Sequence, residues 1–352
     1  MAAPDWKGLF EWSIKNQDTS KPQDPSKVRH VSDEDRKWFA EAMEAHTEDM
    51  HKRLRGIKDA LESKADLPED VDEKLRLLDS LIEIVENIDY ARDLTHIGGL
   101  QTLLGLLQSQ YAPVRASAAE VVATCVQTNP PVQQYFLEGG ALPKLLKLTE
   151  DPDPTVRRKA LLALSCLTRH FDPAMDAFRE QGGLQLLLKT AADTSDPRQQ
   201  RKALQLLREL VRQRPQDIRE AVKAGLLGTL GSAVGSDQAD VREAALALLA
   251  LLVQHPGVIA VSKQDKGLRE ALHAAEQRLR ALDVEDQDAE REQLALVEHI
   301  LQKLDSEQAD VEAQPAEAAA LQPASGAPAV LPETQEAEKE AQQKPVALLG
   351  PP

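Results

Sequence analysis

Residues 139–168 read GGALPKLLKLTEDPDPTVRRKALLALSCLT, and this stretch decides the fold class. It opens on a glycine pair, continues through a short apolar run, breaks at two prolines and ends in a longer segment. From Val156 to Leu167 the apolar residues recur every three or four positions, which is the period of an α-helix and not of a strand. The prolines lie where a new helix begins, because proline fits the first helical turn. The stretch therefore predicts two helices joined by a short loop.

The glycine pair returns along the chain at a nearly constant interval. Its second position falls at Gly99, Gly140, Gly183 and, in a degenerate copy, Gly225. The intervals are 41, 43 and 42 residues, and a second marker, Val-Arg in three of its four copies, follows in phase from positions 114, 156, 199 and 241. Two markers in phase indicate an internal repeat of about 42 residues.

The repeat predicts the architecture. We expect one short helix and two longer ones per repeat, with the chain reversing at a left-handed glycine. A repeat of this length and content is typical of armadillo proteins. The predicted fold is thus all-α: an armadillo-repeat, right-handed superhelical solenoid of about four repeats, whose third helices line the concave face. Helical caps are expected at residues 73–89, 268–282 and 290–304.

Composition divides the chain into three parts. Residues 1–70 are charged and interrupted by prolines, which predicts a flexible N-terminal segment with a short helix. Residues 71–304 form the predicted solenoid with its caps. Residues 305–352 carry nine acidic residues against two lysines, a net charge of −7, and few large apolar side chains. This tail is predicted to be disordered, because it has too little apolar surface to offset the entropy of ordering.

Several function classes are disfavoured. The 352 residues hold 42 Lys and Arg against 58 Asp and Glu, and the net charge of −16 argues against nucleic acid as a partner. No apolar run reaches 18 residues, so no membrane span is expected. Two cysteines cannot build a disulfide framework and indicate a reducing compartment. We find no phosphate-binding loop and no metal-ligand spacing, and we predict no cofactor, no metal, no catalytic residue and no enzyme.

Charge is unevenly distributed within this acidic chain. Residues 156–214 hold twelve basic and six acidic residues, a net charge of +6. Helical periodicity places five arginines and one glutamine on the stripe of the third helices that faces away from the apolar core. These candidate partner-binding residues are Gln127, Arg158, Arg169, Arg201, Arg208 and Arg212. Two interpretations stay open: a solvated face without a partner, or a groove that recognises an acidic protein.

Five further stretches carry a family resemblance. They are LFEWSI (9–14), VSDEDRKWFAEAM (31–43), ENIDYARDL (86–94), IGGL (97–100) and AAEVVATCVQTNP (118–130). Together they resemble the Hsp70-binding, armadillo-type nucleotide exchange factors, with the cytosolic members of plants and algae the most similar. The resemblance extends from about residue 6 to residue 304. The acidic tail has no clear counterpart.

The resemblance implies a function. Members of the family bind the ATPase domain of Hsp70 in the armadillo groove and displace one lobe, so that ADP leaves and client is released. By match to family contact sites, Ala91 and Arg201 are expected on the binding surface, both exposed. Leu9, Phe10, Trp12 and Ile14 are expected either to mimic client or to pack on the solenoid as a cap. The implied protein is a monomeric co-chaperone of the cytosol, in protein quality control and the stress response, and its access to the nucleus stays open.

The alternative is a generic armadillo scaffold that binds an acidic protein or an extended peptide along its groove. Nuclear-import adaptors do this with asparagine and tryptophan ladders on the third helices. Here the three tryptophans are Trp6, Trp12 and Trp38, and all precede the repeats. This pattern counts against the alternative.

Overall fold

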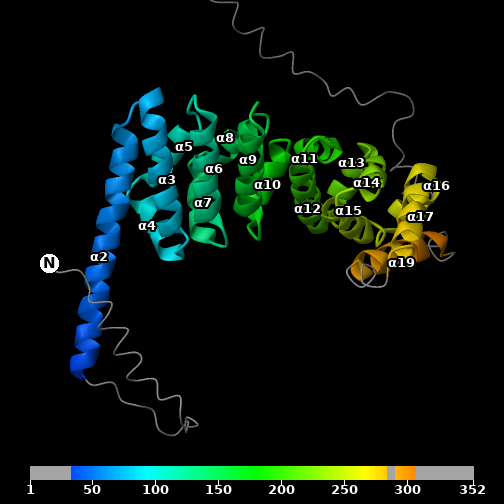
Figure 1. Cartoon of the computed structure of the whole chain (residues 1–352). Helices are drawn as coiled ribbons and strands as arrows, with labels where there is room; N and C mark the ends of the chain where they lie inside the picture. Colours follow the sequence, from blue (N-terminus) through cyan, green and yellow to red (C-terminus); the bar gives the residue numbers. More distant parts are fainter. Residues whose placement is uncertain (1–32, 284–289, 307–352) are drawn as a thin grey trace, which may run out of the picture. The chain divides into compact units, whose positions relative to one another are not determined.

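A computed structural model of the chain describes residues 33–283 and 290–306. Within these ranges every regular element is a helix (Figure 1), which confirms the all-α prediction. The predicted N-terminal client-mimic residues Leu9, Phe10, Trp12 and Ile14 lie outside the described residues, as does the acidic tail from residue 307.

The helices follow the repeat in a fixed order. The first helices of the repeats are α4 (Ile88–His96), α7 (Pro130–Glu138), α10 (Asp172–Glu180), α13 (Pro215–Lys223) and α16 (Pro256–Gln264). The second are α5 (Gly99–Leu106), α8 (Ala141–Leu148), α11 (Gly183–Ala192) and α14 (Leu226–Val234). The third are α6 (Ala112–Val126), α9 (Pro154–Thr168), α12 (Pro197–Gln213) and α15 (Ala239–Leu252). The flanking elements are α2 (Asp33–Ser63), η1 (Pro68–Asp70), α3 (Val71–Val85), α17 (Lys266–Arg280) and α19 (Arg291–Asp305).

Each complete repeat therefore has one long helix and two short ones, and the expectation of two longer helices was wrong. The long third helix ends before a proline that opens the next first helix, as Pro130 opens α7. Because proline cannot donate the backbone hydrogen bond that would continue the preceding helix, the chain starts a separate short helix there.

A left-handed glycine separates the first and second helices of each repeat, as predicted. Gly98, Gly140, Gly182 and Gly225 have φ between +81° and +91°, at intervals of 42, 42 and 43 residues. In the first pair the two glycines have different roles. Gly98 supplies the left-handed conformation, whereas a Cβ on Gly99 would lie 2.3 Å from Leu94 Cδ1. The close packing of α5 on α4 therefore excludes any larger residue at position 99.

The chain divides into two compact units, Met1–Leu210 and Val211–Pro352, so the boundary falls within α12. The predicted solenoid with its caps, residues 71–304, has parts in both units. In the first unit the long helices α3, α6 and α9 lie side by side (Figure 1) and bury side chains such as Leu78, Val122 and Leu164 completely. This row of long helices forms the core against which the shorter helices pack.

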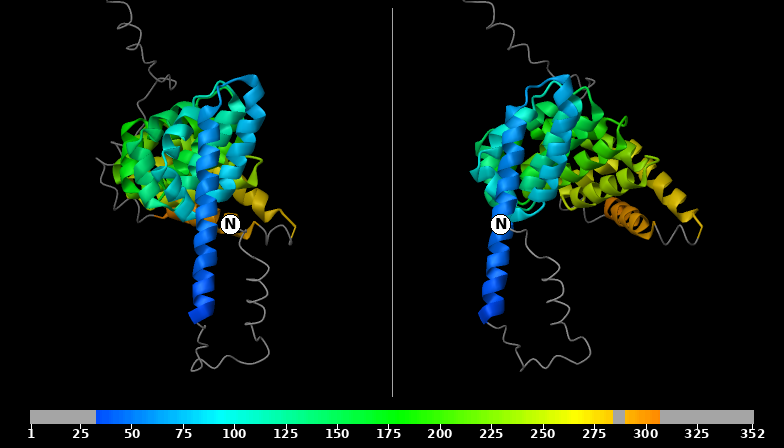
Figure 2. Two further views of the ribbon diagram at one scale, coloured as in Figure 1. Left: turned by 90° about the vertical axis from the view of Figure 1, so that its left-hand side faces the viewer. Right: turned by 60° about the vertical axis from the view of Figure 1, so that its left-hand side comes forward.

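The N-terminal helix α2 is longer than predicted. It runs for 31 residues within the segment expected to be flexible with a short helix. Leu54, Ile57 and Leu61 recur at helical spacing and are buried, and the helix contacts α3, α4 and α5. Its other half, with exposed Trp38 and Phe39, extends past those helices (Figure 2). The apolar stripe of residues 54–61 holds α2 on the first repeat, which explains why a charged segment folds there.

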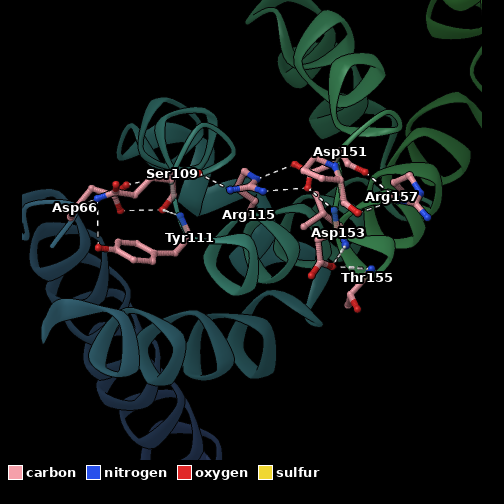
Figure 3. Close-up of polar contacts among 11 residues, drawn as sticks. Asp66, Ser109, Tyr111, Arg115, Asp151, Asp153, Thr155 and Arg157 are labelled. Atoms are coloured by element: carbon pink, nitrogen blue, oxygen red, sulfur yellow. Dashed lines mark hydrogen bonds and ion pairs between the residues drawn. The ribbon is translucent and has the colours of Figure 1, made fainter. Parts of the chain in front are cut away.

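The Val-Arg marker joins successive repeats. Arg115 and Arg157 each donate from Nη1 to a carbonyl of their own preceding loop, that of Ser109 at 2.8 Å and that of Asp151 at 2.9 Å. Arg115 also bonds the Asp151 carboxylate of the next repeat (Figure 3). Asp66 starts the series by accepting from Ser109 Oγ at 2.7 Å. The marker arginines are therefore structural.

The second unit ends in the predicted C-terminal caps. The long helix α15 contacts α14 and α19, and α17 packs on α14 and α19. Arg242, the marker arginine of the fourth repeat, donates to the Ser236 carbonyl at 3.1 Å and from Nη2 to Glu290 Oε1 at 3.2 Å. The same arginine position is thus used again, here to attach the cap.

Candidate functional site

The predicted partner-binding residues lie on or beside four helices. Ala91 is on α4 and Gln127 follows α6. Arg158 is on α9, and Arg169 follows it. Arg201 and Arg208 are on the part of α12 that belongs to the first unit, and Arg212 is on the part that belongs to the second unit. Gln127, Arg169, Arg208 and Arg212 are exposed, and Arg158 and Arg201 are half-buried.

Ala91 is the exception. The family resemblance predicts that it lies on the surface, but only 1% of it is exposed. It lies near the start of α4, and residues at the end of α6, the third helix of the same repeat, lie beside it. A short side chain facing a neighbouring helix is covered even at the edge of the molecule, so the expectation of an exposed alanine was wrong.

Arg169 and Arg201 lie near a third cation, Lys202, which is not among the residues predicted from the sequence. Burial lowers the pKa of the Lys202 ammonium, the Cys166 side chain opposes this effect, and the positive charges of Arg169 and Arg201 lower the pKa further. The end of α9 and the start of α12 thus meet in one group of like charges. We call Arg169, Arg201 and Lys202 the basic cluster. Lys159 occupies the equivalent position in the preceding repeat, and this correspondence could have identified Lys202 from the sequence.

Arg158 differs from these three residues. Its Nη1 donates to Asp196 Oδ2 at 2.8 Å, and its Nη2 donates to Thr155 Oγ1 at 3.1 Å. One third of its side chain is exposed. Arg158 therefore connects two repeats as well as facing solvent, and its charge is largely compensated by Asp196.

A hollow of about 270 Å³ opens at the first repeat. It lies between residues 85–91, at the end of α3 and the start of α4, and residues 124–129, at the end of α6. We call it the α4–α6 hollow. Ala91 and Gln127 both line it, together with the exposed side chains of Glu86 and Ile88. The structure therefore brings two of the predicted site residues together in one cavity.

The two thiols do not have the properties of reactive cysteines. Cys125 on α6 and Cys166 on α9 are free cysteines. Burial raises the pKa of Cys125 to about 12, and burial also raises the pKa of Cys166. Neither thiol has the depressed pKa of a nucleophile at neutral pH.

Among the residues that the structure describes, no group of three or more His, Cys, Asp or Glu side chains is arranged to hold a metal ion. Nor does any helix in residues 33–283 and 290–306 combine the length and apolarity needed to cross a membrane.

Two family models match adjoining parts of the chain. The model described as the SIL1/FES1/HPBP1 C-terminal domain matches residues 90–225. The model described as nucleotide exchange factor Fes1 matches residues 6–94. Both matches include Ala91, and the first also includes the basic cluster.

Curated relatives agree with these models. The Hsp70 nucleotide exchange factor FES1 of Coccidioides immitis is 33% identical over 169 residues, which cover 48% of this chain and 79% of that protein. Mouse Hsp70-binding protein 1 is 35% identical over 177 residues, covering 46% of this chain and 48% of that protein. Human Hsp70-binding protein 1 is 28% identical over 320 residues, covering 86% of each chain.

Solved structures support the fold. The designed armadillo repeat protein YIII(Dq)4CqI has a TM-score of 0.57 at 21% identity, covering 72% of this chain and all of that one. Computationally designed armadillo repeat proteins for modular peptide recognition give a TM-score of 0.55 at 22% identity, covering 71% of this chain and 99% of that one. This likeness confirms the predicted armadillo architecture, and it extends to the fold alone.

Proposed function

This chain belongs to the SIL1/FES1/HPBP1 family of Hsp70 nucleotide exchange factors, and from that premise we propose how its surface acts on the chaperone. It is an Hsp70 co-chaperone with nucleotide exchange activity. We propose that the first unit binds the ATPase domain of Hsp70 and favours the conformation that holds ADP poorly. The observation that carries this proposal is that the two family models together span residues 6–225, which include the basic cluster and the α4–α6 hollow.

The basic cluster suits an acidic face of the chaperone. Arg169 and Arg201 lie close enough to Lys202 to lower its pKa, so the cluster carries a local positive potential within an acidic chain. A complementary negative surface would remove this repulsion on binding and would speed the encounter of the two proteins. Arg208 is exposed and extends the same helix surface.

Exchange by this route requires no chemistry from the co-chaperone. If the co-chaperone binds more tightly to the Hsp70 conformation that has low affinity for ADP, then ADP and the co-chaperone must weaken each other's affinity for Hsp70 by the same factor. The protein then acts as a binding partner and not as an enzyme. We further propose that it works as a monomer and that it works in the cytosol. Its two free thiols, as expected in a reducing compartment, support the second of these proposals.

The reciprocity gives the experiment. The affinity of the full-length protein for the Hsp70 ATPase domain is measured by calorimetry with and without saturating ADP, and the affinity for ADP is measured with and without saturating co-chaperone. We expect both affinities to fall by the same factor. Affinities that do not respond to the other ligand would contradict the proposal.

A further inference from the structure

The α4–α6 hollow has a filled counterpart in the next repeat. The repeat is 42 residues long here, since α4 and α7 begin at Ile88 and Pro130, and α6 and α9 end at Val126 and Thr168. Gln133 on α7 therefore occupies the position that Ala91 occupies on α4. The two repeats thus share one backbone arrangement and differ at this side chain.

Gln133 caps the end of the neighbouring long helix. Its buried side-chain amide donates from Nε2 to the carbonyl oxygens of three residues at the end of α9: Cys166 at 2.9 Å, Leu167 at 3.1 Å and Arg169 at 3.1 Å. The last carbonyls of a helix have no partner within the helix and carry partial negative charge. A donor placed among them is therefore stabilising, and Gln133 supplies it.

The first repeat lacks this donor. Counting back 42 residues, the equivalents of the three capped residues are Thr124, Cys125 and Gln127, and all three line the hollow. The methyl group of Ala91 cannot donate a hydrogen bond. The hollow thus lies where a glutamine amide equivalent to that of Gln133 would be, at the C-terminal end of α6, which carries partial negative charge.

Asn129 adds an acceptor to the same cavity. It lines the hollow and is 2% exposed. Its Nδ2 donates to the Ile88 carbonyl at 3.2 Å, but its Oδ1 has no hydrogen-bond partner among the described residues. The equivalent Asn87 shows why, because its Oδ1 accepts the N–H of Asp89 at 2.9 Å, whereas the residue two after Asn129 is Pro131, which has no N–H.

The charge of the residues around the hollow indicates which kind of hydrogen-bond donor it would bind. Glu86 lines the hollow and is exposed, and none of the described residues that line it is a lysine, arginine or histidine. Ile88 also lines the hollow, is 51% exposed and offers apolar surface. A lysine or arginine side chain matches all of these features, because its stem is apolar and its head group is a charged donor. A volume of about 270 Å³ is several times the share of a water molecule, about 30 Å³, and leaves room for such a side chain.

We propose that the α4–α6 hollow receives a lysine or arginine side chain of the Hsp70 partner. The inserted cation takes the place of the amide that Gln133 provides in the second repeat. The proposal rests on the proposed function, since it names how that partner engages one end of the surface. The hollow then binds a basic side chain of the chaperone, whereas the basic cluster binds an acidic surface. These two preferences together fix the orientation of the bound chaperone.

The test fills the hollow from within. In Ala91→Gln the new side-chain amide can donate hydrogen bonds to the carbonyls at the end of α6, as Gln133 does to those at the end of α9. We expect the full-length variant to keep or raise its thermal unfolding temperature and to bind the Hsp70 ATPase domain about tenfold more weakly or worse. The matched control is Ala192→Gln, an exposed alanine at the end of α11, which should bind like the wild type. A second variant, Glu86→Gln, keeps the shape of the opening and should weaken binding with unchanged stability.

The occupant is identified by double-mutant cycles. Each surface lysine and arginine of the ATPase domain is replaced by glutamine and measured against wild type and Glu86→Gln. One position should couple to Glu86, and the others should be additive. Wild-type affinity in both Ala91→Gln and Glu86→Gln, or additivity at every position, would overturn the proposal while leaving the exchange activity in place. If the wild-type protein itself fails to bind the ATPase domain, the proposed function fails first.

Discussion

Arg115 and Asp151 form a two-fold ion pair between successive repeats, with Nε to Oδ2 at 2.8 Å and Nη2 to Oδ1 at 2.9 Å. Only 14% of the arginine side chain and 7% of the aspartate side chain are exposed. This planar arrangement fixes the orientation of one long helix against the loop of the next repeat. It gives the Val-Arg repeat marker a structural role.

Removing one partner of this pair should destabilise the first unit. In Arg115→Met the Asp151 carboxylate loses two charge-assisted hydrogen bonds while remaining buried, and the expected cost is about 2–4 kcal/mol. Urea unfolding followed by circular dichroism measures it. The control is Lys189→Ala, whose pair with Glu150 is more than half exposed on both sides and should cost less than about 0.5 kcal/mol. Equal costs for the two variants would contradict this role.

Acid should weaken the same network. Burial opposes ionisation of Asp151 and Asp66, yet hydrogen bonds from Arg115 and the Asp153 N–H, and from Ser109, the Gln110 N–H and Lys74, hold the pKa of both carboxyls below the ordinary value of 3.8. The unfolded chain therefore takes up protons at a higher pH than the folded one. Stability is fully present well above pH 3.8 and falls as the pH drops through 3.8 toward the folded-state pKa values.

The measurement is the urea midpoint between pH 6 and pH 3, compared with Asp151→Asn. The variant should be less stable at pH 6, and its midpoint should fall less steeply on acidification. A variant with the same acid slope as the wild type would show that Asp151 does not contribute to it.

The basic cluster should control association with the chaperone. Arg169→Gln combined with Arg201→Gln removes two of its three charges, and the side chain of Arg169 is exposed. We expect a slower association rate for Hsp70, a weaker dependence of that rate on salt, and little change in thermal unfolding. Surface plasmon resonance at several ionic strengths measures the rates. If the folded double variant associates with Hsp70 at the wild-type rate, these arginines belong to a solvated face without a partner.

The thiols should differ in reactivity only through exposure. Cys125 is buried, with a pKa of about 12, whereas Cys166 is half-buried. With a chromogenic disulfide reagent at pH 8, the native protein should show no fast thiol, slow reaction of Cys166, and reaction of Cys125 only after unfolding. The variant Cys166→Ser assigns the signals. A rapid reaction in that variant would contradict the burial of Cys125.

Much of the fold could be predicted from the sequence, because its signals are local. The glycines at positions 98, 140, 182 and 225 mark the turns, since only a left-handed conformation allows the reversal there. The length of α2 was missed because its charged residues hid a buried stripe that includes Leu54 and Ile57. Neither the register of that stripe against α3–α5 nor its burial is visible without the neighbouring helices.

The site was less accessible to sequence reasoning. Arg169 and Arg201 could be placed on one face by helical period alone, but their common neighbour Lys202 depends on how α9 and α12 pack. Ala91 could be singled out only by family resemblance, and its burial depends on the end of α6. The hollow itself follows from a comparison of Ala91 with Gln133, whose hydrogen bonds become visible only in three dimensions.

Stopped-flow release of a fluorescent ADP analogue from Hsp70 measures the exchange activity itself. The full-length protein is mixed at micromolar concentration with the preloaded chaperone in excess unlabelled ATP. We expect a release rate that rises with co-chaperone concentration and saturates, with Ala91→Gln requiring a higher concentration to reach half of the effect. Release at the spontaneous rate at every concentration of the wild-type protein would contradict this expectation.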